Sequence, residues 1–127
     1  MSNRFLAVVA IGLAAMLAAC SSPASPDIVV EPIHIDRVDV LIMQSLPPQA
    51  AAHVTGVVGD GCASLHSLRQ VRSGDTVTVT ILRQRPRVAV CTQIALLYDE
   101  SIHLDGQYPT GTYILRVNDV ERIFTIE

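Results

Sequence analysis

Two cysteines, Cys62 and Cys91, enclose the clearest strand pattern in the chain, and this combination restricts the fold more than any other feature. Between them, at residues 76–81, threonine alternates with valine or isoleucine. A period of two residues is typical of a β-strand with one buried side and one side facing solvent. A bond between the two sulfurs would close a loop of about 30 residues and stabilise a small domain by about 3 to 4 kcal/mol.

The first twenty residues indicate where the protein resides. Arg4 precedes an apolar run at residues 5–17. About 13 residues are too few for a membrane-spanning helix, which needs roughly 20, but they suit a signal peptide. The sequence Leu17-Ala18-Ala19-Cys20 then resembles the lipobox of bacterial lipoproteins. The resemblance implies that residues 1–19 are a lipoprotein signal peptide and that acyl chains such as palmitate are attached to Cys20. An ordinary secretory signal with an unrelated cysteine is the alternative.

Whether the protein is exported determines whether the remaining cysteines are oxidised. Ser21 and Ser22 follow Cys20, where an aspartate would resemble a signal for retention in the inner membrane. We therefore expect a lipid-anchored, extracytoplasmic protein of the bacterial cell envelope, at the outer membrane or the outer face of the cell membrane. In that oxidising compartment Cys62 and Cys91 are predicted to form a structural disulfide. A redox or metal-binding role is the alternative, although redox pairs are more often spaced Cys-x-x-Cys.

The rest of the chain has the pattern of a tether followed by one all-β domain. Prolines and serines predict a tether at residues 20–32, and residues 33–127 are predicted to be a β-sandwich domain. Strand patterns occur at residues 33–45, 53–58, 76–81, 88–94, 96–104, 112–117 and 120–126, with residues 83–87 as a connection. Asn118 and Asp119 tolerate positive φ and are predicted to close a hairpin. About seven or eight short strands predict an antiparallel β-sandwich.

The segment from Gly111 to Val117, Gly-Thr-Tyr-Ile-Leu-Arg-Val, resembles the penultimate strand of immunoglobulin-like domains. The resemblance implies that Tyr113 is a corner tyrosine whose hydroxyl returns to the backbone upstream. Leu115 stands where those domains have a cysteine, and the chain has no tryptophan, so antibody-type domains are excluded. Together with the segments around Cys62 and Cys91, the pattern is similar to that of small uncharacterised bacterial lipoproteins with immunoglobulin-like sandwiches.

Composition argues against several classes of function. The chain has nine Lys+Arg and twelve Asp+Glu residues; without Arg4 the net charge is about −4, which does not suit nucleic-acid binding. No Gly-x-Ser-x-Gly or His-Glu-x-x-His motif is present, so we expect neither an enzyme nor a cofactor. His34 with Asp36, and His103 with Asp105, are spaced to share one face of a strand. A surface metal site is geometrically possible there, but solvated positions are expected and no metal is predicted.

Two segments are candidate binding loops. Arg83, Arg85 and Arg87 would share one side of an extended chain and could bind a carboxylate, a phosphate or a lipid headgroup; a solvated connection is the alternative. The segment Leu46-Pro47-Pro48-Gln49 is stiffened by its prolines. We predict a non-catalytic binding module that is anchored to the membrane through its lipid. Its partner is expected to be an unknown envelope or extracellular protein. The alternative is an inhibitor of secreted proteases that presents loops from one end of the sandwich.

Overall fold

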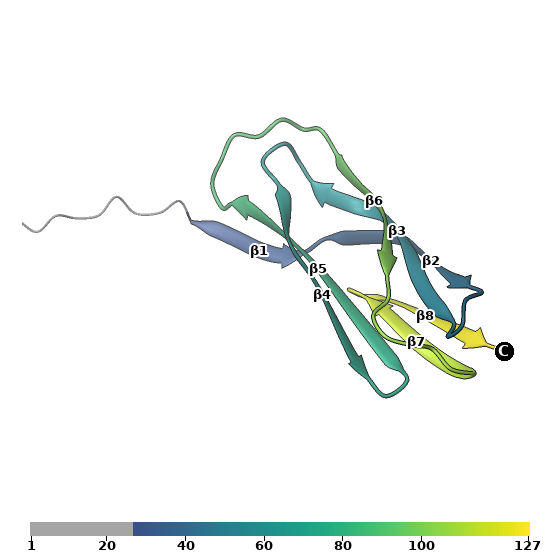
Figure 1. The fold of residues 1–127 in the computed structure, drawn as a ribbon. Helices are drawn as coiled ribbons and strands as arrows, with labels where there is room; N and C mark the ends of the chain where they lie inside the picture. The colour runs from purple at the N-terminus through teal and green to yellow at the C-terminus, as the bar shows by residue number, and fades with distance from the viewer. Residues whose placement is uncertain (1–26) are drawn as a thin grey trace, which may run out of the picture.

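The computed structural model describes residues 27–127, which form eight β-strands in two sheets packed face to face (Figure 1). The strands are β1 (Ile28–Pro32), β2 (His34–Met43), β3 (Gln49–Gly59), β4 (Ser64–Ser73), β5 (Thr76–Pro86), β6 (Leu96–His103), β7 (Gly111–Val117) and β8 (Val120–Ile126). One sheet contains β1, β4, β5, β7 and β8, and the other contains β2, β3 and β6. The prediction of an all-β sandwich is confirmed. No helix within these residues is long and apolar enough to cross a membrane.

Strand β5 is the centre of the larger sheet because it pairs with three other strands. Along one edge it pairs with β4, antiparallel, over the whole length of β4. Along its other edge, residues 82–86 pair with β1 and residues 76–79 pair with β7. The β5–β7 pairing is parallel, so the expectation of a wholly antiparallel sandwich is corrected at this one pair. The buried side chains Val77, Val79 and Ile81 lie on the face that the alternation predicted.

Other local predictions are also confirmed. Strands β7 and β8 form the expected hairpin, and Asn118 in its turn has a φ of 52°. Strand β6 lies in the segment predicted to be extended, and Ile102 on this strand and Leu104 just after it are buried. These predictions succeeded because each depends on residues close together in the sequence.

Three predictions were wrong in ways that matter for the candidate site. Residues 28–32 of the expected tether form the edge strand β1, and Pro32 is tolerated because it is the last residue of that strand. Residues 83–86 of the expected connection belong to β5. Residues 88–94 do not form a strand but lie in the loop between β5 and β6. The signal peptide, Cys20 and the first part of the tether fall outside the described residues.

The core between the sheets is mostly aliphatic, with an aromatic cluster of Tyr108, Tyr113 and Phe124 near one end. The Tyr113 hydroxyl donates a hydrogen bond to the Pro109 carbonyl at 2.6 Å, so the predicted return to the upstream backbone is confirmed. This bond fixes the chain before β7 against the core.

Tyr108 is fully buried, and its hydroxyl donates to the Asp105 carbonyl at 3.0 Å. Burial is the main cause that raises the pKa of the Tyr108 phenol; the Arg72 guanidinium opposes the shift, and Asp105 and Tyr113 add to it. The guanidinium of Arg72 lies 4.5 Å from the centre of the Tyr108 ring, a cation–π contact that covers the cluster. The raised pKa keeps the hydroxyl protonated, so it remains a donor.

The side chain of Asn118 fills the gap on β5 between β1 and β7. Its Oδ1 accepts from the Ile81 N–H at 2.8 Å, and its Nδ2 donates to the carbonyls of Ile33 and Ile81 at 2.9 and 3.1 Å. Ile33 is the residue at which the chain leaves the larger sheet for β2 in the smaller one. One amide therefore pairs the Ile33 carbonyl and the Ile81 N–H, which this change of sheet would leave unsatisfied, while the Ile81 carbonyl also accepts from the Ile33 N–H at 3.1 Å.

Replacement of Asn118 by glycine or alanine should separate two contributions to stability: the hydrogen bonds of its side chain and its tolerance of the left-handed backbone conformation. Both variants leave the Ile81 N–H without its acceptor, so we expect each to lower the free energy of unfolding by about 1–3 kcal/mol. Alanine should cost about 1–2 kcal/mol more, because it disfavours the left-handed conformation that glycine accepts. Denaturant unfolding measures both, with Asp119→Ala in the same turn as the control. A glycine variant as stable as the parent would show that these hydrogen bonds contribute nothing.

Candidate functional site

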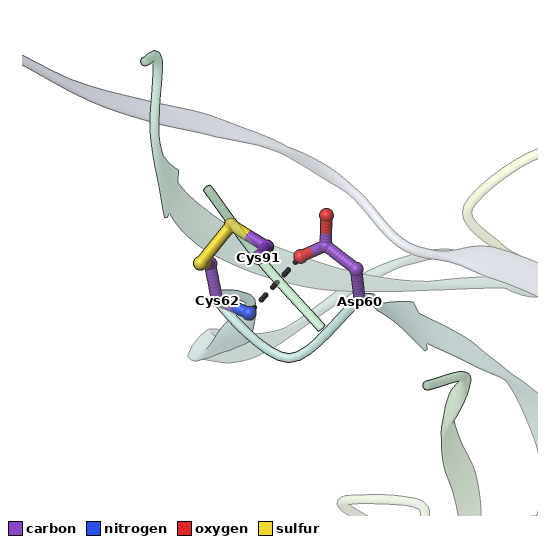
Figure 2. Close-up of side chains that lie close together, drawn as sticks. All are labelled: Asp60, Cys62 and Cys91. Atoms are coloured by element: carbon purple, nitrogen blue, oxygen red, sulfur yellow. Dashed lines mark hydrogen bonds between the residues drawn. A yellow bond between two sulfur atoms is a disulfide. The ribbon is translucent and has the colours of Figure 1, made fainter. Parts of the chain in front are cut away.

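The predicted disulfide is present at one end of the sandwich (Figure 2). Cys62 lies in the turn after β3, and Cys91 lies in the β5–β6 loop, which we define as residues 87–95. Their Cα atoms are 5.4 Å apart, within the usual range for a disulfide. The bond therefore ties the loop that leaves the larger sheet to the turn that leaves the smaller one.

Backbone contacts support this link. The Asp60 carboxylate accepts a hydrogen bond from the Cys62 N–H at 3.1 Å (Figure 2), which shapes the turn. The Gly61 N–H donates to the Thr92 carbonyl at 3.0 Å. A side chain at Gly61 would collide with that of Thr92, so this turn needs glycine there for close approach. One covalent bond and one backbone hydrogen bond thus tie the β5–β6 loop to the turn after β3.

The three arginines at this end already have acidic partners. Arg83 and Arg85 continue the inward face of β5 beyond Ile81, since alternate residues of a strand share one side. Arg83 binds Glu31, its cross-strand neighbour on β1, at 2.6 Å, and also the Val58 carbonyl at 2.7 Å.

Arg85 binds Asp60 at 2.8 Å, and Arg87 pairs with Asp27. The Arg85 Nε is buried, and within the described residues it has no hydrogen-bond partner. Each guanidinium is already paired with a carboxylate of this chain, so an external anion would meet a charge that is largely neutralised. The structure therefore brings the predicted arginines together but gives them an internal role in closing the sandwich.

The β5–β6 loop is the feature that the sequence reasoning missed. Residues 88–97 include no Asp, Glu, Lys, Arg or His. Val88, Val90 and Ile94 are 90%, 105% and 61% exposed, although the same residues had predicted a partly buried strand. The absence of any charge over this run was the available signal, but it also fits a buried strand, so the sequence alone did not distinguish them.

The second candidate loop lies at the opposite end of the molecule, between β2 and β3 (Figure 1). Leu46 is fully exposed, and the Ser45 hydroxyl donates to the Pro47 carbonyl at 2.7 Å. Gln49 belongs to β3, so the loop itself is residues 44–48. An open hollow of about 570 Å³ lies beside it, with Ile42, Met43 and Ile126 among its lining residues. This end therefore combines an exposed apolar tip with a concave surface.

Histidines and acidic groups lie together at several places. His34 contacts Asp36 at 3.0 Å, as their spacing suggested, and His53 contacts Asp99 at 2.6 Å on the neighbouring strand. Within residues 27–127 the cluster with metal-ligand spacing is Asp60, Cys62 and Cys91. A metal takes the thiolate form of cysteine, and both sulfurs here are joined to each other. The oxidised cluster is therefore a structural link.

Comparison with known proteins gives a family but no activity. The family model described as "ORF11 beta-sandwich domain" matches residues 52–126. Similar proteins of Herpetosiphon aurantiacus include the "Uncharacterized 10.2 kDa protein in HgiBIM 5'region", 37% identical over 76 residues, which are 60% of this chain and 93% of the relative. Its counterpart in the HgiCIIM 5'region is 31% identical over 86 residues, 68% of this chain and 92% of the relative. No solved structure matches.

Removal of the Cys62–Cys91 disulfide should destabilise the domain markedly. In the chain-entropy model it contributes about 3 to 4 kcal/mol, and each kcal/mol shifts the melting temperature of a domain of about 100 residues by roughly 4 °C or more. We therefore expect reduction, or the double change Cys62→Ala and Cys91→Ala, to lower the melting temperature by at least about 10 °C. Reductant should have no further effect on the double variant, which is the control. An unchanged melt would contradict a structural role for the bond.

Proposed function

This chain belongs to the ORF11 beta-sandwich domain family, and we propose that it is a lipid-anchored, extracytoplasmic binding module that uses the sandwich as a rigid support for its loops. The proposal includes an amino-terminal signal peptide at residues 1–19 and acylation of Cys20. The bound partner is an envelope or extracellular protein, and the module performs no catalysis.

The observation that carries the proposal is the Cys62–Cys91 disulfide. Structural disulfides persist in oxidising compartments and are rare in the cytosol, so this bond supports export. It also uses both cysteines other than Cys20, which leaves the cysteine of the lipobox-like sequence as the single thiol available for acylation. Two or three acyl chains give an anchor that is stable on the bilayer.

We further propose that the sandwich is immunoglobulin-like. The contact between the Tyr113 hydroxyl and the Pro109 carbonyl, four residues upstream, supports this assignment because a corner tyrosine makes that kind of contact. The sheets of five and three strands and the change of sheet after β1 also suit such a domain. The cysteines differ from the immunoglobulin pattern, since they join loops at one end rather than the two sheets through the core.

We propose different roles for the two ends of the sandwich. Strand β1 begins beside the β5–β6 loop, so the tether enters the domain at the disulfide end (Figure 1). The β2–β3 loop lies at the other end of β3, an 11-residue strand that spans about 35 Å at roughly 3.3 Å per residue. Leu46 would thus be presented well away from the bilayer, beside the hollow of about 570 Å³. This end is the proposed partner-binding surface.

A protease inhibitor is the second candidate function. The exposed Leu46 and the prolines beside it favour it, because an inhibitor loop must be extended, accessible and ordered before it binds. The two candidates use the same loop, and they differ in whether the partner is a secreted protease.

Changing Cys20 to serine should release the protein from the membrane. Without the thiol no acyl chain can be attached, so we expect the variant to move from the membrane fraction to the soluble fraction of the envelope. Fractionation of cells that express the full chain measures this, and Cys62→Ala with Cys91→Ala serves as the control that keeps Cys20. Unchanged fractionation of the Cys20 variant would contradict the lipid anchor.

Changing Leu46 to glutamate should remove the partner without unfolding the domain, because the native side chain is fully exposed. The full chain and this variant are used to capture proteins from detergent-solubilised envelope, and we expect a partner that the parent chain captures and this variant does not. Leu65→Glu, an exposed position on β4, is the matched control. A panel of secreted proteases assayed with the same proteins separates the candidates: no inhibition at micromolar concentration removes the inhibitor function. Identical capture by all three proteins would overturn the assignment of the binding surface.

A further inference from the structure

We propose that the β5–β6 loop is a second membrane contact, which rests in the interfacial region of the lipid bilayer beside the anchor and sets the orientation of the domain. This inference rests on the proposed lipid anchor and adds a surface to it. Three observations support the inference: where the tether enters the domain, what the loop exposes, and how the loop is held.

The tether enters the domain directly at the loop. The Arg87 N–H, the first in the β5–β6 loop, donates to the Asp27 carbonyl at 2.9 Å. Asp27 and Cys20 are separated by about seven peptide units, and a fully extended chain covers at most about 3.6 Å per residue, or about 25 Å. An acylated Cys20 lies in the headgroup region, so Asp27 and the Arg87 end of the loop are held within about that distance of the bilayer.

The exposed side chains of the loop suit the bilayer interface better than water. Val88, Val90 and Ile94 project apolar surface, and no residue of the loop after Arg87 is charged. Leu97, at the start of β6, is 75% exposed and extends the apolar surface. The nearby Arg83, Arg85 and Arg87 each have a carboxylate partner, so insertion of the loop tip does not require an unpaired charge to leave water. Several exposed apolar side chains on one loop, with no charge among them, are typical of an interaction site.

The loop is ordered before it meets a partner. The disulfide and the hydrogen bond from Gly61 to Thr92 fix its centre to the β3 turn. Because little conformational entropy remains to be lost, contact with the bilayer needs only burial of the apolar side chains. A protein partner is the less suitable occupant, since the anchor holds this end of the sandwich against the membrane and limits access to it.

The experiment uses the absence of tryptophan from the chain. Val90→Trp places a single reporter on the loop, and Leu46→Trp places the same reporter on the opposite end, at a similarly exposed position. Each full chain is purified from the envelope and reconstituted into phosphatidylcholine–phosphatidylglycerol vesicles with and without brominated acyl chains. We expect tryptophan emission from the Val90→Trp chain to shift to the blue and to lose most of its intensity with brominated lipid. Emission from the Leu46→Trp chain should stay unshifted and unquenched.

A second change tests whether the apolar side chains cause the contact. Tryptophan itself favours the bilayer interface, so Val88→Asp is added to the Val90→Trp chain and should largely abolish the quenching. Melting temperatures verify that the variants fold, and mass spectrometry of the amino-terminal peptide reports acylation of Cys20.

The outcomes separate the inference from the function on which it rests. One outcome is that the chain is acylated but neither reporter, in the β5–β6 loop or in the β2–β3 loop, is quenched. The membrane contact is then overturned while the anchor stays intact, and the loop is assigned to a protein partner. Equal quenching of both reporters also overturns it, because the domain would then have no fixed orientation. A chain without acyl groups on Cys20 overturns the proposed anchor, and the inference fails with it.

Discussion

The fold depends on the way in which one strand, β5, is shared among three partners. Strand β4 covers one edge, and β1 and β7 divide the other edge between them. Such a division leaves a gap where one partner ends and the next begins, and unpaired backbone groups in a gap are costly when buried. The Asn118 amide closes the gap with hydrogen bonds to Ile33 and Ile81. The change of sheet after β1 is therefore compatible with a continuous larger sheet.

Strand β5 also explains why the sandwich is apolar at its centre and carries ion pairs at the disulfide end. Its inward face carries Val77, Val79 and Ile81 in the centre of the core, and then Arg83 and Arg85 where the sheets open at the disulfide end. Those guanidiniums bind Glu31 and Asp60. Because the pairs are only partly buried, they contribute modestly to stability. Their larger effect is to fill the open end with neutralised polar groups, next to a loop that has no charge after Arg87.

A feature of the site could be predicted where it depends on residue counts or on residues close together in the sequence, and could not where it depends on residues far apart. The disulfide followed from cysteine count and expected compartment, and the Tyr113 contact from a local resemblance. The arginines were predicted to lie in a loop because nothing near them in the sequence shows that Glu31 on β1 pairs with Arg83. Residues 88–94 were predicted to be a strand because an uncharged, β-branched run fits one. Whether it becomes a strand depends on a partner edge, and within the described residues none pairs with it.

The sequence by itself determined which residues face the core in β5, where the β7–β8 hairpin turns, and that Cys62 and Cys91 are the pair of cysteines within the β-domain. Period, turn chemistry and composition are local properties, and they act before any long-range contact forms. Only the tertiary structure decided that β1 joins the larger sheet, that β7 lies parallel to β5, and that the β5–β6 loop emerges beside Asp27, where β1 begins. These three features depend on which strand edges pair. Strands that are distant in the sequence come to pair only through the packing and backbone hydrogen bonding of the whole chain.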